Sequence, residues 1–332
     1  MASGEPVLGS LFVYAPNQAA PIFFTIAFGL SAVGHIWQCI RYKSFKLLGL
    51  HPLCAILFTA GYALREYGSM NYLYSDQNLI IYILSQVFIY VCPPLLELAN
   101  YHVLGRVLYY IPYLAPMPPG RVLATFGALM ALVETLNAVG VALSSNPSSD
   151  ISQQKLGSNL IISALVIQLV VILIFVVLAG IFHGRCRRSN LHVKAVSTTL
   201  VVLYISMALI LIRCIYRLVE HVGNTTVDIS DLELLEALSP LLRYEVYFYI
   251  FEASVMLINS VIWNIWHPGR SLPRSSNVHL SPDGETEVTD REDVDDRSLL
   301  AKVACILTFG ILLRKRTKNA PFHELDDYQA AR

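Results

Sequence analysis

The chain has 332 residues, of which 55% are hydrophobic and 14% charged, and its formal net charge at pH 7 is zero. A soluble domain carries roughly a quarter charged residues, so this composition excludes an ordinary soluble protein and indicates an integral membrane protein. The neutral balance also argues against nucleic acid as a partner, because the basic residues form only short clusters beside the ends of apolar segments.

Seven segments of the chain are apolar enough to cross a bilayer, which takes about 20 residues in a helix. They are Pro21–Ile40, Leu47–Leu64, Leu79–His102, Val122–Leu143, Leu160–Phe182, Ala195–Leu218 and Tyr244–Trp266. Because lipid offers no partner for free backbone groups, and nothing alternates with the period of a β-barrel, each span must be a helix. The predicted fold class is all-α: an N-terminal segment (1–20), a seven-helix transmembrane domain (21–267) and a largely disordered tail (268–332).

The Lys and Arg residues predict the orientation of these spans. With the N-terminus outside, the outer connections hold Lys155 and Arg243. The inner connections then hold Arg41, Lys43, Lys46, Arg106, Arg121, Arg185, Arg187, Arg188, Lys194, Arg270 and Arg274. This bias predicts an N-terminus outside and a cytoplasmic tail, with the first span as its own signal anchor.

Polar side chains recur within spans two to five. They are Arg65, Gln86, Glu134, Asn137 and Gln168, all in the outer or middle third of their spans. An ionisable group inside a span costs about 2.5–3.5 kcal/mol on insertion scales, so such groups face a bundle interior or a wet cavity. For the amides we favour hydrogen bonds that hold the helices together. For Glu134, and for Arg213, Arg217 and Glu252 of the last two spans, we favour a water-accessible cavity that opens outward.

Spans six and seven carry charges at matching depth. Arg213 and Glu252 each lie roughly 10–12 Å from the outer end of their spans at 1.5 Å per residue. Because the two spans are consecutive and antiparallel, Arg213 is predicted to pair with Glu252, and Arg217 with Glu245. Arg213, Arg217 and Glu220 share one helix face.

A second polar group lies toward the predicted cytoplasmic side. It comprises His35, Glu97, Asn100, His102, Asn259, Asn264 and His267. No HExxH motif or paired-histidine spacing is present, so no metal site and no cofactor are predicted. No phosphate-binding loop of the GxxxxGK[ST] type occurs either, so the chain carries no visible ATPase.

The last outer connection contains Asn224-Thr225-Thr226, a glycosylation sequon on the side where glycosylation occurs. It is followed by Asp231–Leu238, a stretch predicted to form a short acidic helix with leucines on one stripe. The tail from Pro268 to Asp296 is predicted to be disordered. The apolar run Val303–Leu313 is too short to span the bilayer. Either it dips into the inner leaflet or it reflects an error at the end of the gene model.

Several motifs resemble the fungal lipid-translocating exporter family, seven-span proteins named for resistance to aminocholesterol that include a sphingoid long-chain-base exporter. The most specific is Arg213-Cys214-Ile215-Tyr216-Arg217-Leu218-Val219-Glu220, followed by Glu245, Tyr247, Phe251, Glu252 and His267-Pro268-Gly269. Supporting motifs are Gly61-Tyr62 with Arg65, the string Gln86, Pro93-Pro94, Tyr101 and Gly105-Arg106, and Gly157 with Gln168. This chain departs from the family by having Glu252 in place of an Asp, and Met130 and Asn137 in place of an Asp and a Gln, with Glu134 as a stand-in.

The resemblance implies a plasma-membrane protein, not an enzyme, that exports amphiphilic lipids such as sphingoid bases and protects against toxic lipids or drugs. The residues assigned to substrate binding are Arg65, Glu134, Arg213, Arg217, Glu245 and Glu252. Those assigned to structural hydrogen bonds are Gln86, Glu97, Asn137, Gln168 and Glu220. Membrane lipids are the expected partners. Two alternatives remain: a seven-span lipid sensor without transport, and an intramembrane lipid hydrolase with zinc, which the scattered histidines disfavour.

Overall fold

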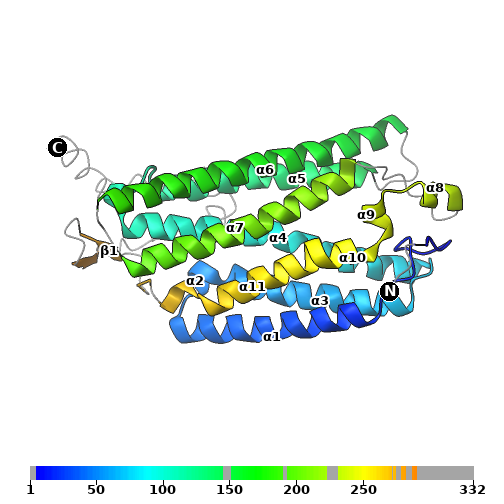
Figure 1. The fold of residues 1–332 in the computed structure, drawn as a ribbon, viewed down its shortest axis with the longest axis horizontal. Helices are drawn as coiled ribbons and strands as arrows, with labels where there is room; N and C mark the ends of the chain where they lie inside the picture. The colour runs from blue at the N-terminus through cyan, green and yellow to red at the C-terminus, as the bar shows by residue number, and fades with distance from the viewer. Residues whose placement is uncertain are drawn as a thin grey trace, which may run out of the picture.

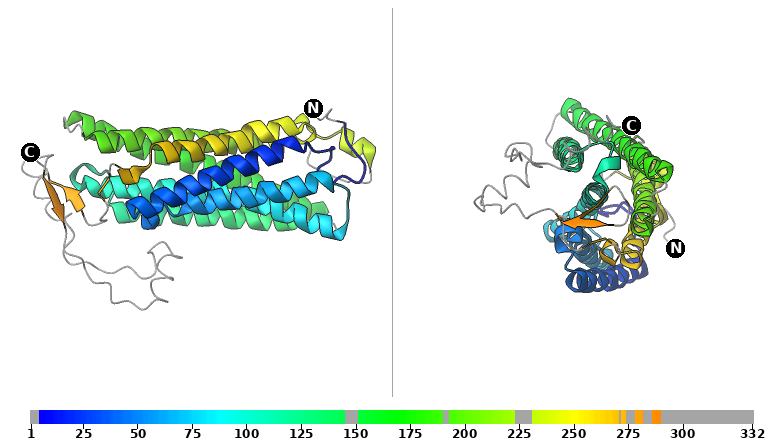
Figure 2. Two further views of the ribbon diagram at one scale, coloured as in Figure 1. Left: turned by 90° about the horizontal axis from the view of Figure 1, so that it is seen from below. Right: turned by 90° about the vertical axis from the view of Figure 1, so that its left-hand side faces the viewer.

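A computed structural model describes residues 5–144, 151–189, 193–222, 231–270, 272–273, 278–281 and 286–289. The sequon at Asn224 and the apolar run 303–313 lie outside the described residues. The described part is an elongated bundle of helices that run side by side along its longest axis (Figures 1 and 2). The N-terminal residues lie at one end of the bundle and the strands at the other.

The long helices of the bundle are α1 (Ala19–Tyr42), α3 (Leu50–Met70), α4 (Asp76–Tyr110), α5 (Pro119–Ser144), α6 (Ile151–Arg188) and α7 (Lys194–Val222). A further rod consists of α10 (Glu245–Phe248), η2 (Tyr249–Ser254) and α11 (Val255–Ile265), which follow one another without a break. Within the described ranges, six segments are long and apolar enough to cross a membrane. The fold is therefore that of a polytopic, all-α membrane protein. The predicted second span falls on α3, a helix of 21 residues that is less apolar than the other six.

Short elements connect the long helices. They are α2 (Phe45–Leu48), η1 (Pro112–Leu114), α8 (Leu232–Glu236), α9 (Pro240–Arg243) and η3 (Pro268–Arg270). The acidic helix predicted near Asp231 is confirmed as α8. The Asp231 carboxylate caps its first turn by accepting from the backbone N–H groups of Glu233 and Leu234. Pro119 begins α5, at a position where a missing N–H costs nothing.

At the end of the bundle that carries α8, here called the α8 end, residues 5–17 fold back over the helices. Phe12, Val13 and Tyr14 pack against Leu235 and Leu238 in a small apolar cluster of their own. Nothing in the hydropathy pattern predicts this packing, because the segment before the first span contains too few apolar residues to form a core alone.

At the opposite end, here called the β1 end, a small hairpin forms from β1 (Val278–Leu280) and β2 (Glu287–Thr289), which are antiparallel. Arg106 of α4 donates to the carbonyl of Val278 at 3.2 Å, and the Tyr110 hydroxyl donates to Glu287 at 2.8 Å. The prediction that the whole segment 268–296 is disordered is therefore wrong for these two strands. The side chains of Val278 and Leu280 are buried at the end of α4, and the apolar surface buried there favours an ordered segment despite its acidic neighbours.

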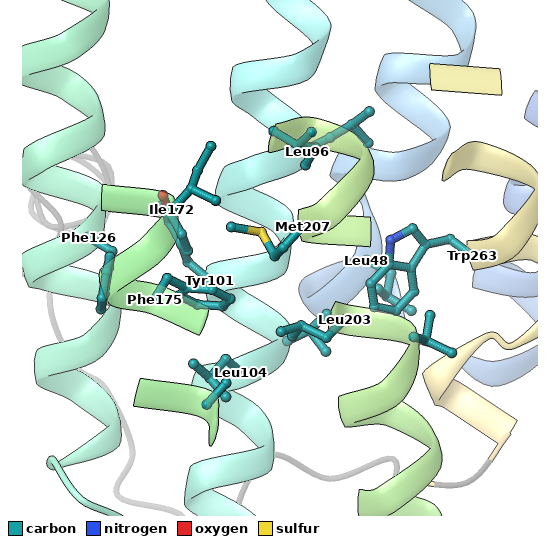
Figure 3. Packing of buried hydrophobic residues seen from close by; sticks show 14 of the residues in the cluster. Leu48, Leu96, Tyr101, Leu104, Phe126, Ile172, Phe175, Leu203, Met207 and Trp263 are labelled. Carbon is teal, nitrogen blue, oxygen red and sulfur yellow. The ribbon is translucent and has the colours of Figure 1, made fainter. Parts of the chain in front are cut away.

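The apolar core lies along the axis of the bundle (Figure 3). The rings of Tyr101, Phe126 and Phe175 from α4, α5 and α6 meet with centroids 5.0–5.4 Å apart. The outer faces of the helices expose large aliphatic side chains, among them Leu30 and Val177. In a soluble protein this surface would be an aggregation hazard, whereas in a membrane it contacts lipid.

Gly140 lies at a close approach between α5 and α6, and small residues allow such approaches in membranes. A Cβ atom here would lie 2.7 Å from the Ile161 side chain and 2.8 Å from the carbonyl oxygen of Gly157. We expect Gly140→Ala to destabilise the bundle by about 1–3 kcal/mol through overpacking, seen as a lower melting temperature in detergent. Gly180→Ala on α6 is the control, because a Cβ there meets nothing within 4 Å. Equal melting temperatures for the two variants would contradict the close packing.

Candidate functional site

The predicted pair between Arg213 of α7 and Glu252 of η2 is confirmed. The Nε–H group of Arg213 is shared by both carboxylate oxygens of Glu252, at 3.0 and 2.9 Å. The exposed fraction is 5% for Arg213 and 0% for Glu252. The ion pair therefore lies in the closed interior of the bundle, where each charge depends on the other.

Glu252 lies in a π-helical segment, which sequence reasoning did not predict. The six residues of η2 interrupt an otherwise α-helical rod between α10 and α11. A π-bulge places an extra residue in the turn and rotates the side chains that follow, and it occurs frequently at functional sites. No periodicity in the sequence indicates it, since the flanking residues continue the same apolar pattern.

Arg217 does not pair with Glu245, so that prediction is wrong. Its Nη1 group instead donates to Glu220, one turn further along α7, and to the hydroxyl of Tyr90 at 3.3 Å. The guanidinium also lies over the Tyr90 ring, 4.3 Å from its centroid. The shared helix face of Arg217 and Glu220 was visible in the sequence, and the i, i+3 contact takes precedence over the contact between helices.

Glu245 pairs with Arg65 of α3 instead, with 3.1 Å between Nη2 and Oε1. Its second oxygen accepts from the backbone N–H of Asn17 at 2.7 Å. Arg65 also donates to the hydroxyls of Tyr14 and Tyr249, at 3.3 and 3.2 Å. The N-terminal segment thus completes this second buried ion pair, a role that sequence analysis did not assign to it.

The Arg65 guanidinium is enclosed by aromatic rings. Its central carbon lies 4.2 Å from the ring centroid of Phe248, 4.9 Å from Phe12 and 5.4 Å from Tyr249. Such cation–π contacts are worth about 2 kcal/mol or more when desolvated. Such an aromatic enclosure can bind a cationic group of the protein or of a ligand.

Glu97 lies deeper in the charged layer than its sequence position suggested. One of its oxygens accepts from the Gln168 amide of α6 at 2.8 Å, and the other accepts from the Tyr101 hydroxyl. The sequence placed Gln168 in the outer or middle third of its span and Glu97 in a separate group toward the cytoplasm, whereas their contact brings the two side chains to the same depth. A count of residues from the span ends does not specify such a contact.

Three of the sequence-predicted residues are half-buried and have no hydrogen bond or ion pair with these groups among the described contacts, although Glu134 lies near enough to Arg213 to interact electrostatically. They are Gln86 of α4 and Glu134 and Asn137 of α5. The water-accessible cavity expected around Arg213, Arg217, Glu134 and Glu252 stays a prediction, since Arg217 and Glu134 are half-buried. Arg65, Arg213, Glu245 and Glu252 are all at most 5% exposed. Four of the six residues assigned to substrate binding are therefore packed against protein in this conformation.

Metal ligands do not gather in the described part of the chain, where no group of three or more His, Cys, Asp or Glu residues is arranged to hold an ion. Two of the histidines considered in the sequence, His35 and His267, lie instead beside aromatic rings or a hydroxyl. His35 stacks on His51, and His51 contacts Trp263.

Comparisons with known proteins agree on one family. A family model described as RTA1 like protein matches residues 52–275. A protein of Leptosphaeria maculans named lipid-translocating exporter-like protein RTA1 is 54% identical over 318 residues, which are 94% of this chain and 61% of that protein. The chain thus spans about three-fifths of that relative's length. No solved structure matches.

Two further relatives carry similar names. A lipid-translocating exporter-like protein RTA1 of Ajellomyces capsulatus is 32% identical over 67% of this chain and 70% of its own length. The probable lipid transporter atnI of Emericella nidulans is 24% identical over 86% of this chain and 72% of its own. These matches confirm the resemblance read from the motifs around Arg213 and Glu252. The chain belongs to the RTA1-like family of membrane proteins.

Proposed function

We propose that this chain crosses the plasma membrane seven times, with its N-terminus outside, and moves a cationic amphiphile from the inner to the outer leaflet. A sphingoid long-chain base is the substrate class that we favour, and protection against toxic lipids would be the consequence. The names of the relatives support lipid transport in general. Six of these spans are the apolar segments described above. The remaining one would be α3, the second span in chain order, which packs between α1 and α4 within the bundle.

The observation that carries this proposal is the buried carboxylate of Glu252, held by a single guanidinium N–H. A carboxylate in the interior of a membrane domain requires a cationic partner. The ammonium group of a sphingoid base has the same charge as Arg213 and donates the same kind of hydrogen bond. Exchange of one cation for another at Glu252 would therefore keep this carboxylate paired while the headgroup is bound.

The other assigned residues have distinct roles in this proposal. Arg213 and Arg217 hold the acidic side chains while the site is empty, and Arg65 with Glu245 closes the α8 end beneath the N-terminal segment. Opening would separate residues 5–17 from Arg65 and expose the aromatic side chains around it. Glu134 would contact the headgroup from α5, beside an apolar hollow lined by Ala128 and Leu132 that suits an acyl chain.

We expect the purified chain, reconstituted in phosphatidylcholine vesicles, to move a fluorescent NBD-labelled sphingosine between leaflets faster than protein-free vesicles do. The bleaching of outer-leaflet label by dithionite measures this rate. NBD-labelled phosphatidylcholine is the control, because its phosphate opposes binding to a carboxylate. A sensor would bind the labelled sphingosine without moving it, so binding with no change in rate would overturn transport in favour of sensing.

A further inference from the structure

The hydroxyl group of Tyr62, in the Gly61-Tyr62 motif of α3, has no role in the site described above. Tyr62 is 0% exposed, and its hydroxyl has no hydrogen-bond partner among the described residues. A buried hydroxyl without a hydrogen bond is unfavourable, so its presence in a native interior calls for an explanation. Its position indicates one, because Tyr62 lies near enough to Glu252 of one buried ion pair and to Arg65 of the other to interact electrostatically with both.

Aromatic rings fix the orientation of the Tyr62 side chain. Its ring stacks on those of Phe24 and Phe28 of α1, with centroids 5.3 and 5.5 Å away. The ring of Phe58 on α3 lies 6.3 Å away, and that of Phe248 on α10 lies 6.4 Å away. Such contacts restrict the ring and therefore the direction of its hydroxyl. Phenylalanine has no hydrogen-bonding atom in its side chain, so none of these four neighbours can serve as the partner.

The rod that carries Glu252 passes close to Tyr62. Phe248, whose ring contacts the Tyr62 ring, lies about one helical turn before Glu252 on this rod. The rod packs against both α1 and α3 within the bundle (Figure 1). The buried carboxylate and the unpartnered hydroxyl therefore belong to one region of the interior, between α3 and the rod.

Two other tyrosines near the ion pairs already have partners. The hydroxyl of Tyr90 accepts from Arg217 at 3.3 Å, and that of Tyr249 accepts from Arg65 at 3.2 Å. The Tyr62 hydroxyl, by contrast, keeps its capacity to donate one hydrogen bond and to accept another. A ligand whose cationic group lies at Glu252 would therefore meet a hydrogen-bonding group at Tyr62 that the closed protein does not use.

The headgroup of a sphingoid base matches this combination of groups. Its ammonium group is separated by a single carbon–carbon bond from a carbon atom that bears a hydroxyl. Two hydroxyl groups can bind each other whichever of them donates, so the lipid hydroxyl and Tyr62 are compatible partners. A long-chain amine without hydroxyl groups carries the same charge but would leave the Tyr62 hydroxyl without a partner.

We propose that Tyr62 binds a hydroxyl group of the lipid while Glu252 binds its ammonium group, so that the site selects long-chain amino alcohols over simple long-chain amines. This inference rests on the proposed function and adds to it a residue that sets the class of headgroup. A site that hydrogen-bonds a ligand hydroxyl discriminates against the analogue that lacks it, because the polar group of the site is then left unpaired.

The test compares the binding of two amines to the full-length chain in a mild detergent. NBD-labelled sphingosine is the probe, its fluorescence polarisation reports binding, and unlabelled sphingosine or octadecylamine displaces it. We expect the wild type to bind sphingosine roughly tenfold more tightly than octadecylamine, as for one hydrogen bond whose loss leaves a buried group unpaired. Tyr62→Phe should lower this affinity ratio by the same factor, by weakening the binding of sphingosine and not that of octadecylamine.

Tyr204→Phe is the matched control. The hydroxyl oxygen of Tyr204 on α7 is likewise buried without a hydrogen-bond partner among the described residues, but its ring stacks on that of His183 on α6. Both amines enter detergent micelles, so the affinity ratio of Tyr62→Phe is compared with the ratios of the wild type and of this control. Tyr204→Phe should keep the wild-type ratio.

The melting temperature without ligand separates binding from structure. Tyr62→Phe keeps the stacked ring and removes an unpartnered hydroxyl, so this variant should melt at or above the wild-type temperature. If it does not fold, the wild type itself decides, since sphingosine should then raise its melting temperature more than the same concentration of octadecylamine does. An unchanged affinity ratio in folded Tyr62→Phe, or equal stabilisation of the wild type by both amines, would overturn the role of Tyr62 and leave the proposed function intact. Binding of neither amine by the wild type would overturn the proposed function and this inference with it.

Discussion

Arg213→Ala should destabilise the bundle by about 3–5 kcal/mol, because removing one partner leaves the other charge buried and unpaired. Glu252 is 0% exposed, so water does not reach its carboxylate from the surface to replace the lost partner. The measurement is the melting temperature and the yield of monodisperse protein in detergent. Arg121→Ala provides the control, because Arg121 is exposed at the start of α5 and its loss should leave both quantities unchanged.

A double-mutant cycle separates the pair from its surroundings. If Arg213 and Glu252 interact as the 2.9 Å contact indicates, Glu252→Gln should cost much less in the Arg213→Ala background than in the wild type. The coupling free energy between the two residues should be favourable, since Glu252→Gln removes the buried charge that Arg213→Ala leaves unpaired. Strict additivity of the two changes would show that the contact contributes nothing.

The Arg213–Glu252 contact could be predicted because two conditions coincide. The helices are consecutive, so they are antiparallel neighbours, and helical rise gives both residues the same depth. Depth does not specify the direction in which a side chain points, however. For that reason Arg217 was assigned to Glu245, although Glu220 lies on its own helix face and Arg65 reaches Glu245 from α3.

Other parts of the site carry no signal in the sequence. The contribution of Tyr14 and Asn17 depends on a chain reversal before α1, which places polar loop residues on the Arg65–Glu245 pair. The π-helical turn at Glu252, which packs against α7, interrupts a segment whose apolar pattern continues on both sides. The contact of Glu97 with Gln168 depends on how α4 and α6 pack against each other. Each of these is tertiary, so hydropathy and spacing predict the helices more readily than the contacts between them.

The β1–β2 hairpin is a further case in which local composition does not predict a tertiary contact, here by predicting disorder where the structure has strands. Its segment has the Ser-rich, Pro-rich and acidic composition of a disordered tail, and composition alone predicts disorder. Two short stretches nevertheless gain enough from burying Val278 and Leu280, and from the bonds to Arg106 and Tyr110, to adopt a defined structure. The partner surface that stabilises them is the end of α4, which a local reading of the tail does not include.

Replacing the whole buried pair, Arg213→Met with Glu252→Leu, should separate folding from function. Exchange of a buried ion pair for apolar residues of similar volume is often neutral or stabilising by about 1–4 kcal/mol, so this variant should reach at least the wild-type melting temperature. If Glu252 binds the ammonium headgroup, the movement of NBD-labelled sphingosine should nevertheless fall to the rate of protein-free vesicles. The control is Glu97→Gln, which keeps the hydrogen-bonding shape of a residue assigned to structure and should preserve transport. A stable apolar variant that still moves the labelled sphingosine would show that the lipid amine is recognised without the Glu252 carboxylate, and Glu252 would then not belong to the substrate site.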